Sequence, residues 1–426
     1  MLSDDEILTT LCELENEKAH DQLPLVWHSA SGSKIFDKDG NSWIDLTSSI
    51  FVTNCGHCHP KMVEALSQGV HKLSHAYTYP TEERAIYLRK LIDSSPKELE
   101  MAVLLSTGTE ASERALKIAV KYSRERHASK SLVLGIDGNF HGKTFGALLA
   151  GGFHDQKAWI AQANDMFKHI AFPYPWVLEK ESISGSEFFA AQINELEEKG
   201  IASEQFCCLF LESFQGWGAI FYPSDFVQAA REWCTKHHVL LIFDECQGGF
   251  GRTGKMFAYE HYGVTADIVT CGKGISGSLP LSAVLGRAEV IKADANYTST
   301  HGGHPLSCIA GTATLDIIEE EGLIEEALRK EALIKQWYEE IKAEFPSIIG
   351  PAFIVGMIAG IFIYKPDTQE LDIDRCELII KKCFDNGVFH INTGRGTLKI
   401  GPPLNIPDGL LNEALAKTTE AIRATS

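Results

Sequence analysis

The sequence has little positive charge, no long apolar run and no internal repeat. Its 426 residues include 39 Lys and Arg against 57 Asp and Glu, a formal net charge of −18. This balance argues against nucleic acid and anionic membranes as partners. No apolar stretch approaches the roughly 20 residues of a membrane helix, and the acidic first residues lack the apolar core of a signal peptide. We therefore expect a cytoplasmic protein.

The cysteines lack the pairing of a disulfide-bonded or metal-binding protein. There are 11, an odd number, scattered through apparent strands and helices, as is usual in a reducing compartment. One cluster, Cys55-Gly-His57-Cys58-His59, has residue types that bind metals. No second ligand pair at matching spacing follows it, so we predict no metal site.

Short apolar runs alternate with helical patterns between about residues 100 and 290. The runs are typical of buried strands and lie at 101–106, 131–135, 207–212, 239–245 and 267–272. Helical segments, such as 109–126 and 224–238, separate them. This pattern predicts an α/β fold with a largely parallel sheet covered by helices on both faces. In such sheets, ligands bind beyond the carboxyl ends of the strands.

The rest of the chain has an α+β pattern, which predicts a second, smaller domain. A long helix is expected over 305–345, followed by a strand at 356–364, a helix at 371–386 and an extended segment at 397–406. A hairpin over 35–46, turning at Asp39-Gly40, is expected to join this domain. The predicted division is therefore 51–304 for the large domain, with 1–50 and 305–426 forming the small one.

One predicted strand leads into a helix through a glycine-bearing turn. In LLSTGTEASERALK (104–117) the helix begins near Gly108-Thr109. Free backbone N–H groups and the positive end of the helix dipole suit a phosphate there. An ordinary N-cap made by Ser106, Thr107 or Thr109 is the alternative.

Two further predicted strands end in charged residues. Asp244 and Glu245 close one apolar run, and a buried carboxylate needs a cation or a strong donor. Lys273 follows another run between Gly272 and Gly274, which indicates a partly buried amine. Burial lowers the pKa of a lysine and favours Schiff-base chemistry. A phosphate cradle, a strand-end acid and a buried lysine match the needs of pyridoxal phosphate.

Five motifs occur in an order shared with one known family. They are GHCHP (56–60), STGTEASERALK (106–117), FHGKT (140–144), DECQGGFGRTG (244–254) and CGKGISGSLPLSAVLG (271–286). By these motifs the chain resembles, from about residue 25 to 420, the class III, or ω-amino-acid:pyruvate type, aminotransferases. The resemblance implies the fold-type I architecture, pyridoxal 5′-phosphate as cofactor and ping-pong amino-group transfer to a keto acid.

The resemblance also implies roles for individual residues. Lys273 would form the Schiff base, Asp244 would pair with the pyridine nitrogen, and Gln247 would contact the phenolic oxygen of the cofactor. Glu212 would help to hold the network at the strand ends. Because the family forms dimers with the site at the interface, Thr300 would reach the phosphate of the neighbouring subunit, and at least a homodimer is expected.

The same resemblance implies contacts on the phosphate and on the ring. Gly108 and Thr109 would bind the phosphate, and Phe140 would stack on the ring beside His141. For His141 an alternative stays open, in which the imidazole only packs beneath the cofactor.

Three positions depart from the 4-aminobutyrate and acetylornithine types. Lys143 replaces an Arg that holds a substrate carboxylate, Trp217 replaces a Glu, and Lys399 replaces the late-strand Arg that pairs with this Glu. Lys offers a point charge where Arg makes two parallel hydrogen bonds to a carboxylate. Arg395 is a candidate substitute anion binder, with a solvated loop arginine as the alternative.

These changes predict an amino donor other than plain 4-aminobutyrate. A long or bulky ω-amine, a β-amino acid or derivative, or an amino sugar would fit, with pyruvate or 2-oxoglutarate as acceptor. A phospho-lyase, an aminomutase or an epimerase on the same scaffold is the alternative. Retention of Lys273, Asp244, Gln247 and Thr300 disfavours a catalytically silent binding protein. No G-x-G-x-x-G follows an early strand, which disfavours a nicotinamide dehydrogenase.

Overall fold

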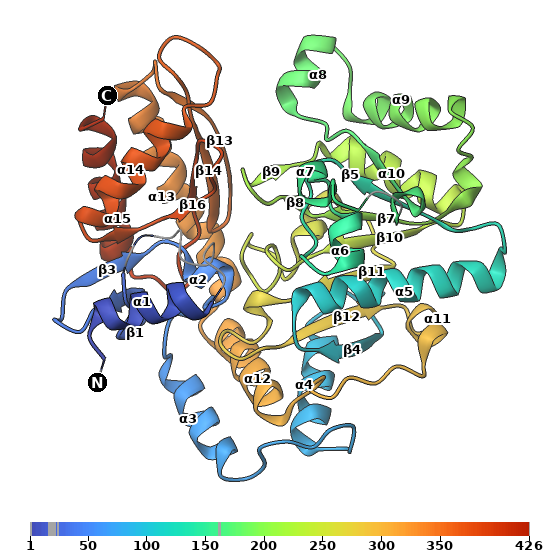
Figure 1. The fold of residues 1–426 in the computed structure, drawn as a ribbon, viewed down its shortest axis with the longest axis horizontal. Helices are drawn as coiled ribbons and strands as arrows, with labels where there is room; N and C mark the ends of the chain where they lie inside the picture. The colour runs from blue at the N-terminus through green and yellow to red at the C-terminus, as the bar shows by residue number, and fades with distance from the viewer. Residues whose placement is uncertain (1, 16–22, 24, 161–162, 426) are drawn as a thin grey trace.

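A seven-stranded sheet forms the centre of the larger part of the molecule (Figure 1). The computed structural model describes residues 2–15, 23, 25–160 and 163–425. The strand order is β4 (Met101–Leu105), β12 (Ser282–Gly286), β11 (Ile268–Cys271), β10 (Leu240–Asp244), β7 (Phe206–Glu212), β5 (Leu132–Ile136) and β6 (Phe167–Ile170). Strand β12 runs antiparallel to both of its neighbours, and the remaining pairs are parallel.

Helices bury both faces of this sheet. Side chains alternate along each strand, so that Phe210 and Ile242 pack with α5 (Gly108–Arg126) on one face. Leu211 and Phe243 belong to the core on the other face, with α10 (Ser224–Lys236) and α9 (Gly185–Glu198). The predicted α/β fold with a mostly parallel sheet is confirmed.

The N-terminal and C-terminal segments of the chain together form the smaller part of the molecule (Figure 1). One sheet has the order β1 (Ser29–Ser31), β2 (Lys34–Phe36), β3 (Ser42–Asp45) and β15 (Val388–Phe389), and β15 runs parallel to β3. A second sheet has the order β13 (Ile349–Val355), β14 (Ile358–Ile363), β17 (Thr397–Ile400) and β16 (Ile391–Asn392). The domain boundaries at residues 50 and 305 stay a prediction.

The remaining elements are short connections and covering helices. They are α1 (Asp4–Leu14), α2 (Ser48–Phe51), α3 (Pro60–Val70), α4 (Glu82–Asp93), α6 (Phe145–Ala150), α7 (His154–Lys157), α8 (Pro175–Glu181), α11 (Ala288–Ile291), α14 (Ile373–Asp385), α15 (Asp408–Arg423), and the hairpin of β8 (Phe214–Gln215) and β9 (Ile220–Phe221). Within the described ranges, no helix is long and apolar enough to cross a membrane.

The prediction of one long helix over 305–345 is wrong. The segment forms α12 (Pro305–Glu320) and α13 (Leu323–Glu344), which are separated at Gly322. Gly322 has φ 58°, in the left-handed region that ends a helix and that glycine adopts without strain. Helix α12 packs against α3 and α4, whereas α13, after the break, packs against β13.

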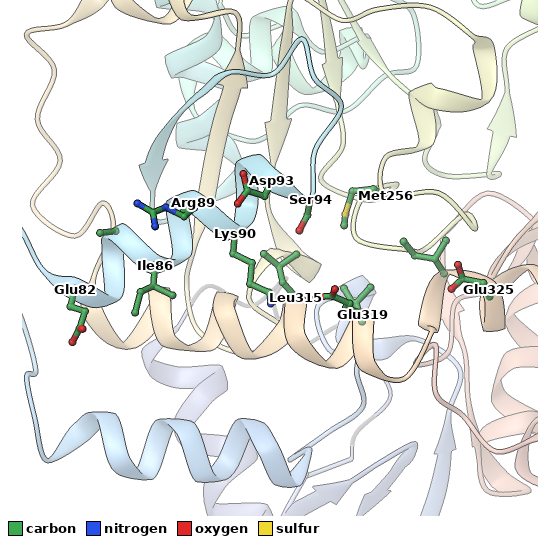
Figure 2. Close-up of a pocket in the computed structure, with 13 residues that line it drawn as sticks. Glu82, Ile86, Arg89, Lys90, Asp93, Ser94, Met256, Leu315, Glu319 and Glu325 are labelled. Carbon is green, nitrogen blue, oxygen red and sulfur yellow. Dashed lines mark hydrogen bonds and ion pairs between the residues drawn. The ribbon is translucent and has the colours of Figure 1, made fainter.

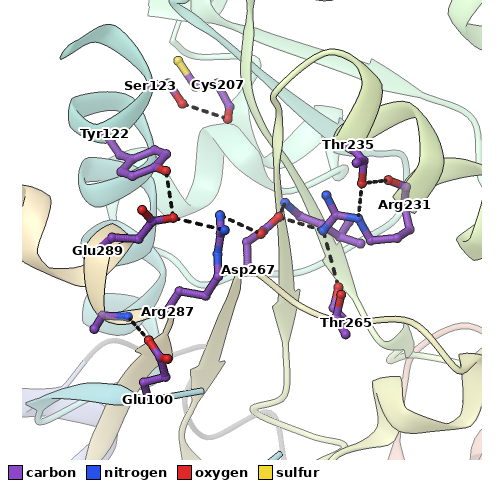
Figure 3. A network of polar contacts seen from close by, with 12 residues as sticks. Glu100, Tyr122, Ser123, Cys207, Arg231, Thr235, Thr265, Asp267, Arg287 and Glu289 are labelled. Carbon is purple, nitrogen blue, oxygen red and sulfur yellow. Dashed lines mark hydrogen bonds and ion pairs between the residues drawn. The ribbon is translucent and has the colours of Figure 1, made fainter. Parts of the chain in front are cut away.

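A buried acid ties the amino ends of the strands together (Figure 3). Asp267 directly precedes β11 and accepts hydrogen bonds from Arg231 Nη1 at 2.7 Å and from the Leu241 N–H at 2.8 Å. Arg287 Nη2 lies 3.1 Å from the other oxygen of Asp267. This network therefore braces the edge of the sheet opposite to the one where β7, β10 and β11 end.

A buried histidine is expected to weaken the fold in acid. His390 lies 2.9 Å from Thr418 Oγ1, and burial lowers the pKa of His390 to about 4 from the ordinary 6.5. The unfolded chain therefore binds a proton between pH 6.5 and 4 that the folded chain does not, and stability falls as the pH drops through this window. For His390 alone, the free energy of unfolding should fall by about 2 kcal/mol between pH 7 and 5.

Urea unfolding of the natural protein and of His390→Gln at both pH values measures this contribution. The variant should lose about 2 kcal/mol less than the natural protein over the same interval. Equal losses in the two proteins would contradict a neutral buried His390.

Candidate active site

Three residues with ionisable side chains meet at the carboxyl ends of adjacent strands. Glu212 and Asp244 are the last residues of β7 and β10 and are direct partners in the strand register. Lys273 lies two residues after β11, which pairs with β10 on its other side. The parallel strands thus gather two carboxylates and an amine at the edge where ligands bind in such folds.

Asp244 is a buried carboxylate with several donors. It accepts a hydrogen bond from the Cys246 N–H at 3.0 Å, and its other oxygen lies 2.9 Å from His141 Nδ1. Burial acts to raise the pKa of Asp244, but the contact with His141, the Cys246 amide and the charge of Lys273 outweigh it and hold the pKa below its ordinary value. Asp244 is therefore an ionised anion that can pair with a protonated ring nitrogen.

The side chain of Lys273 is half-buried, and its amine has no polar partner among the described residues. Its side chain makes no hydrogen bond or ion pair with any residue that the structure describes. Its backbone has φ 49°, in the left-handed region where a residue with a Cβ is strained. Such strain is common at functional sites. The amine is available for a covalent bond beside the buried charge of Asp244.

The start of α5 offers donors for a phosphate. Thr107 is the N-cap of α5 and forms a capping box with Glu110, which confirms the N-cap alternative. The amides of Gly108 and Thr109, the first two helical residues, still have no acceptor within the helix. A Cβ at Gly108 would lie 2.9 Å from Cys246 Sγ, so a side chain would close the space next to these amides. This cradle fits an anionic group.

His141 lies behind Asp244. Its ring stacks on Phe210 with a centroid distance of 3.9 Å, and its Nε2 is buried without a partner among the described residues. The neighbouring Phe140 is half-buried, and its N–H donates to Glu212 Oε2 at 2.9 Å. His141 therefore orients Asp244 and helps to keep its pKa low, while Phe140 is an aromatic residue that remains accessible to a ligand ring.

Lys399 lies within the site, and it is not a free anion binder. Its Nζ donates to the Gly216 carbonyl and to Gln247 Oε1, the latter at 2.9 Å. Burial lowers the pKa of Lys399 to about 7, against the opposing charge of Glu212. Burial, with the charge of Asp244, raises the pKa of Glu212 to about 8.

Aromatic rings hold Arg395 near the site. Its guanidinium carbon lies 4.4 Å from the ring centroid of Phe153 and 5.5 Å from that of Trp217. Trp217 is fixed in turn, because its indole N–H donates to Gln215 Oε1 at 2.6 Å. No carboxylate among the described residues forms an ion pair with Arg395. The guanidinium is therefore preorganised and has donors left for an anion.

Two other predicted site residues, Lys143 and Thr300, make no polar contact with this cluster within the described chain. Lys143 is exposed and makes no hydrogen bond or ion pair with the described residues. Thr300 is exposed on the loop before α12, where its carbonyl oxygen lies 3.0 Å from His75 Nε2. Its role at a neighbouring subunit stays a prediction.

The Cys-His cluster of the GHCHP motif is divided between different partners. His57 Nε2 lies 2.8 Å from Asp45, and His59 Nε2 lies 2.8 Å from Glu321. Over the residues described, no three metal-type side chains come together in a metal-binding group.

A separate groove of about 860 Å³ lies between α4, α12 and the start of α13 (Figure 2). Charges of both signs line it, among them Arg89, Lys90 and Glu319, and neither Lys273 nor Asp244 contributes to it. The chemistry of the strand ends, and not the size of this groove, identifies the candidate site.

Sequence reasoning missed two neighbours of the site. Cys246 stands between Asp244 and Gln247, and its sulfur packs against the glycine that starts α5. Its place inside a motif was a signal that could have been used. Phe153 contacts Arg395 across about 240 residues of sequence, and no local pattern indicates that contact.

Comparisons with known proteins agree with this geometry. Residues 16–422 match the family described as aminotransferase class-III. The chain is 34% identical over 416 residues, 92% of each chain, to a probable 4-aminobutyrate aminotransferase of Bacillus subtilis. It is 32% identical over 410 residues to an acetylornithine aminotransferase of Methanopyrus kandleri, covering 95% of this chain and 96% of the relative.

The fold is shared with solved structures at lower identity. A taurine:2-oxoglutarate aminotransferase from Bifidobacterium kashiwanohense, in complex with PLP and glutamate, superposes with a TM-score of 0.90 at 24% identity, covering 100% of this chain and 98% of that one.

Proposed function

This chain belongs to the class-III aminotransferase family, and we propose that it transfers the amino group of an ω- or β-amine other than plain 4-aminobutyrate to a keto acid. It is a transaminase that depends on pyridoxal phosphate. When bound, this cofactor supplies an electron sink for negative charge on the substrate carbon.

Each residue at the strand ends is proposed to bind a different part of the cofactor. Lys273 would hold the cofactor through its side-chain amine, and the same amine would move protons at the reacting carbon. Asp244 keeps the ring nitrogen protonated, and His141 supports that charge from behind. The amides of Gly108 and Thr109 bind the phosphate.

The other assignments complete the proposed assembly. Phe140 would stack on the cofactor ring, and Gln247 would contact its phenolic oxygen. Thr300 reaches the phosphate of the neighbouring subunit in a cytoplasmic homodimer. Membership of the family supports this assembly. The resemblance from which these residue roles are taken also implies a site at a dimer interface.

The substrate proposal rests on the position of the Arg395 guanidinium. Two aromatic rings fix its guanidinium, and no described carboxylate neutralises it. Trp217, at the position where a 4-aminobutyrate type carries Glu, presents an apolar face to this guanidinium. We assign the carboxylate of the keto acid, such as pyruvate or 2-oxoglutarate, to Arg395, and the apolar body of a bulky amine to the face of Trp217.

Arg395→Gln is expected to raise the KM for the keto acid by about 10- to 100-fold, since a charge-assisted pair of hydrogen bonds is lost. The KM for an amine without a carboxylate should change little. Steady-state kinetics with both substrates measures the difference. Lys143→Gln is the matched control, because it removes an exposed cation of the FHGKT motif that makes no hydrogen bond or ion pair with the described residues, and we expect a small effect. If Lys143→Gln raises the KM for the keto acid more than Arg395→Gln does, Lys143 and not Arg395 binds the carboxylate.

A screen of amine donors against pyruvate and 2-oxoglutarate tests the reaction itself. Amino-acid product should form together with a reversible change in the absorbance of the bound cofactor. Release of ammonia and phosphate from a phosphorylated amino alcohol, without a keto acid, would identify a lyase instead. Preferred turnover of 4-aminobutyrate would overturn the substrate proposal and leave the family unchanged.

A further inference from the structure

We propose that Lys399 is a positioning residue, which fixes the side-chain amide of Gln247 with its N–H group toward the cofactor, and is not a substrate-binding residue. This inference rests on the proposed contact between Gln247 and the phenolic oxygen of pyridoxal phosphate. It changes the role expected for Lys399 from the sequence, where it stood in place of an arginine for a substrate carboxylate.

The donors of Lys399 are already used within the protein. A lysine ammonium has three N–H groups. Two of them meet the Gly216 carbonyl and Gln247 Oε1, and Nζ also lies 4.7 Å from the ring centroid of Phe51. The residue is 4% exposed, so water does not compete for these positions. A substrate carboxylate would have to displace a protein acceptor to reach Nζ.

The contact with Lys399 determines which end of Gln247 remains available. A primary amide has one oxygen acceptor and two N–H donors, and it can turn by 180° to exchange them. Because the ammonium form of Lys399 can only donate, it holds Oε1 on its own side. Gln247 Nε2 makes no hydrogen bond with the described residues, and the side chain is half-buried. The group presented to the cofactor space is therefore a donor, which suits a phenolate oxygen.

Three separate segments hold the ammonium of Lys399 in place. Strand β17 carries Lys399 and pairs with both β14 and β16. Phe51 comes from α2, a single turn in which all four residues have positive φ. Gly216 follows β8 in the larger part of the molecule. The contact thus links the C-terminal sheet to the loop after β10. The charged groups that face Lys399 are Glu212, Lys273 and Arg252.

A double-mutant cycle between Lys399 and Gln247 tests this role in the absence of substrate. The dissociation constant of pyridoxal phosphate and the pH titration of its absorbance are measured for the natural protein, Lys399→Met, Gln247→Ala and the double variant. We expect each single change to weaken cofactor binding by about tenfold. We expect the double variant to match Gln247→Ala within about twofold, because the two residues act as one unit.

Lys130→Met is the matched control for loss of a buried lysine. Lys130 is 2% exposed and also donates to two carbonyl oxygens, those of Phe206 and His237, away from the strand-end cluster. Its removal should leave the cofactor dissociation constant and absorbance titration unchanged. If Lys399→Met does not fold, Gln247→Glu replaces it. This variant keeps an acceptor for Lys399 and loses the N–H, and it should bind the cofactor about tenfold more weakly.

Two results would overturn the inference. One is a Lys399→Met or Gln247→Glu variant that binds the cofactor as tightly as the natural protein. If the KM of Lys399→Met then rises only for substrates that carry a carboxylate, Lys399 binds the substrate. The other is a double variant whose loss equals the product of the single losses. If the natural protein turns over no amine, the proposed reaction is rejected but this inference is not. The double-mutant cycle measures cofactor binding, which needs no substrate.

Discussion

Lys273→Ala is expected to lower the transamination rate by about 10⁴-fold. By the proposed role of Lys273, the variant loses both the covalent link to the cofactor and the amine that moves protons at the reacting carbon. No other described amine can replace it, because Lys399 is buried against Gly216 and Gln247. The cofactor should still associate through the phosphate cradle and Asp244, so the loss should appear in kcat more than in cofactor affinity.

Single-turnover kinetics and borohydride trapping measure this loss. The natural protein should retain cofactor covalently after reduction, and Lys273→Ala should not. A small external amine should restore part of the rate, since it replaces the missing base. Lys236→Ala, an exposed lysine of α10, is the control and should behave as the natural protein. Covalent retention of cofactor by Lys273→Ala would reject the assignment.

Asp244→Asn is expected to lower the rate by about 10³-fold, equivalent to ~4 kcal/mol of transition-state stabilisation. The amide still accepts from the Cys246 N–H, so the strand end should keep its shape. The negative charge that we propose to hold a proton on the ring nitrogen is lost, and the carboxylate oxygen 2.9 Å from His141 Nδ1 is replaced by a neutral amide. The change therefore removes electrostatic stabilisation with little repacking.

The half-reaction with a good amine donor, followed by cofactor absorbance, isolates this effect from product release. Asp267→Asn is a matched control, because it neutralises a buried acid of the same sheet at the opposite edge. The control should lower the free energy of unfolding and leave the rate per folded molecule unchanged. A rate loss under tenfold in Asp244→Asn would contradict its pairing with the ring nitrogen.

The strands and the core of the site could be predicted because their signals are local. The apolar runs that lead to Asp244 and Lys273 are fully buried strands, and a charged residue within two positions of the end of such a run must lie near the strand end. The edge strand β6 was missed, since FKHI at 167–170 is too polar to form an apolar run. The break at Gly322 depends on one residue within a strongly helical segment.

The lining of the site could not be predicted in the same way. Gln247 and Lys399 meet across about 150 residues, and Arg395 and Phe153 across about 240. Such contacts depend on how β17 lies relative to the large sheet, which no residue pattern encodes. Family resemblance supplied positions for Lys399 and Trp217, but it could not supply their contacts with Gln247 and Arg395.

The pairing of β15 with β3 has a consequence for biosynthesis. Phe389 emerges from the ribosome roughly 340 residues after its partner Asp45, which at about 5–20 residues per second is on the order of 20–70 s. During that time the edge of β3 has no partner and can pair with another strand. Nascent or C-terminally truncated chains should therefore need a chaperone far more than the finished chain does.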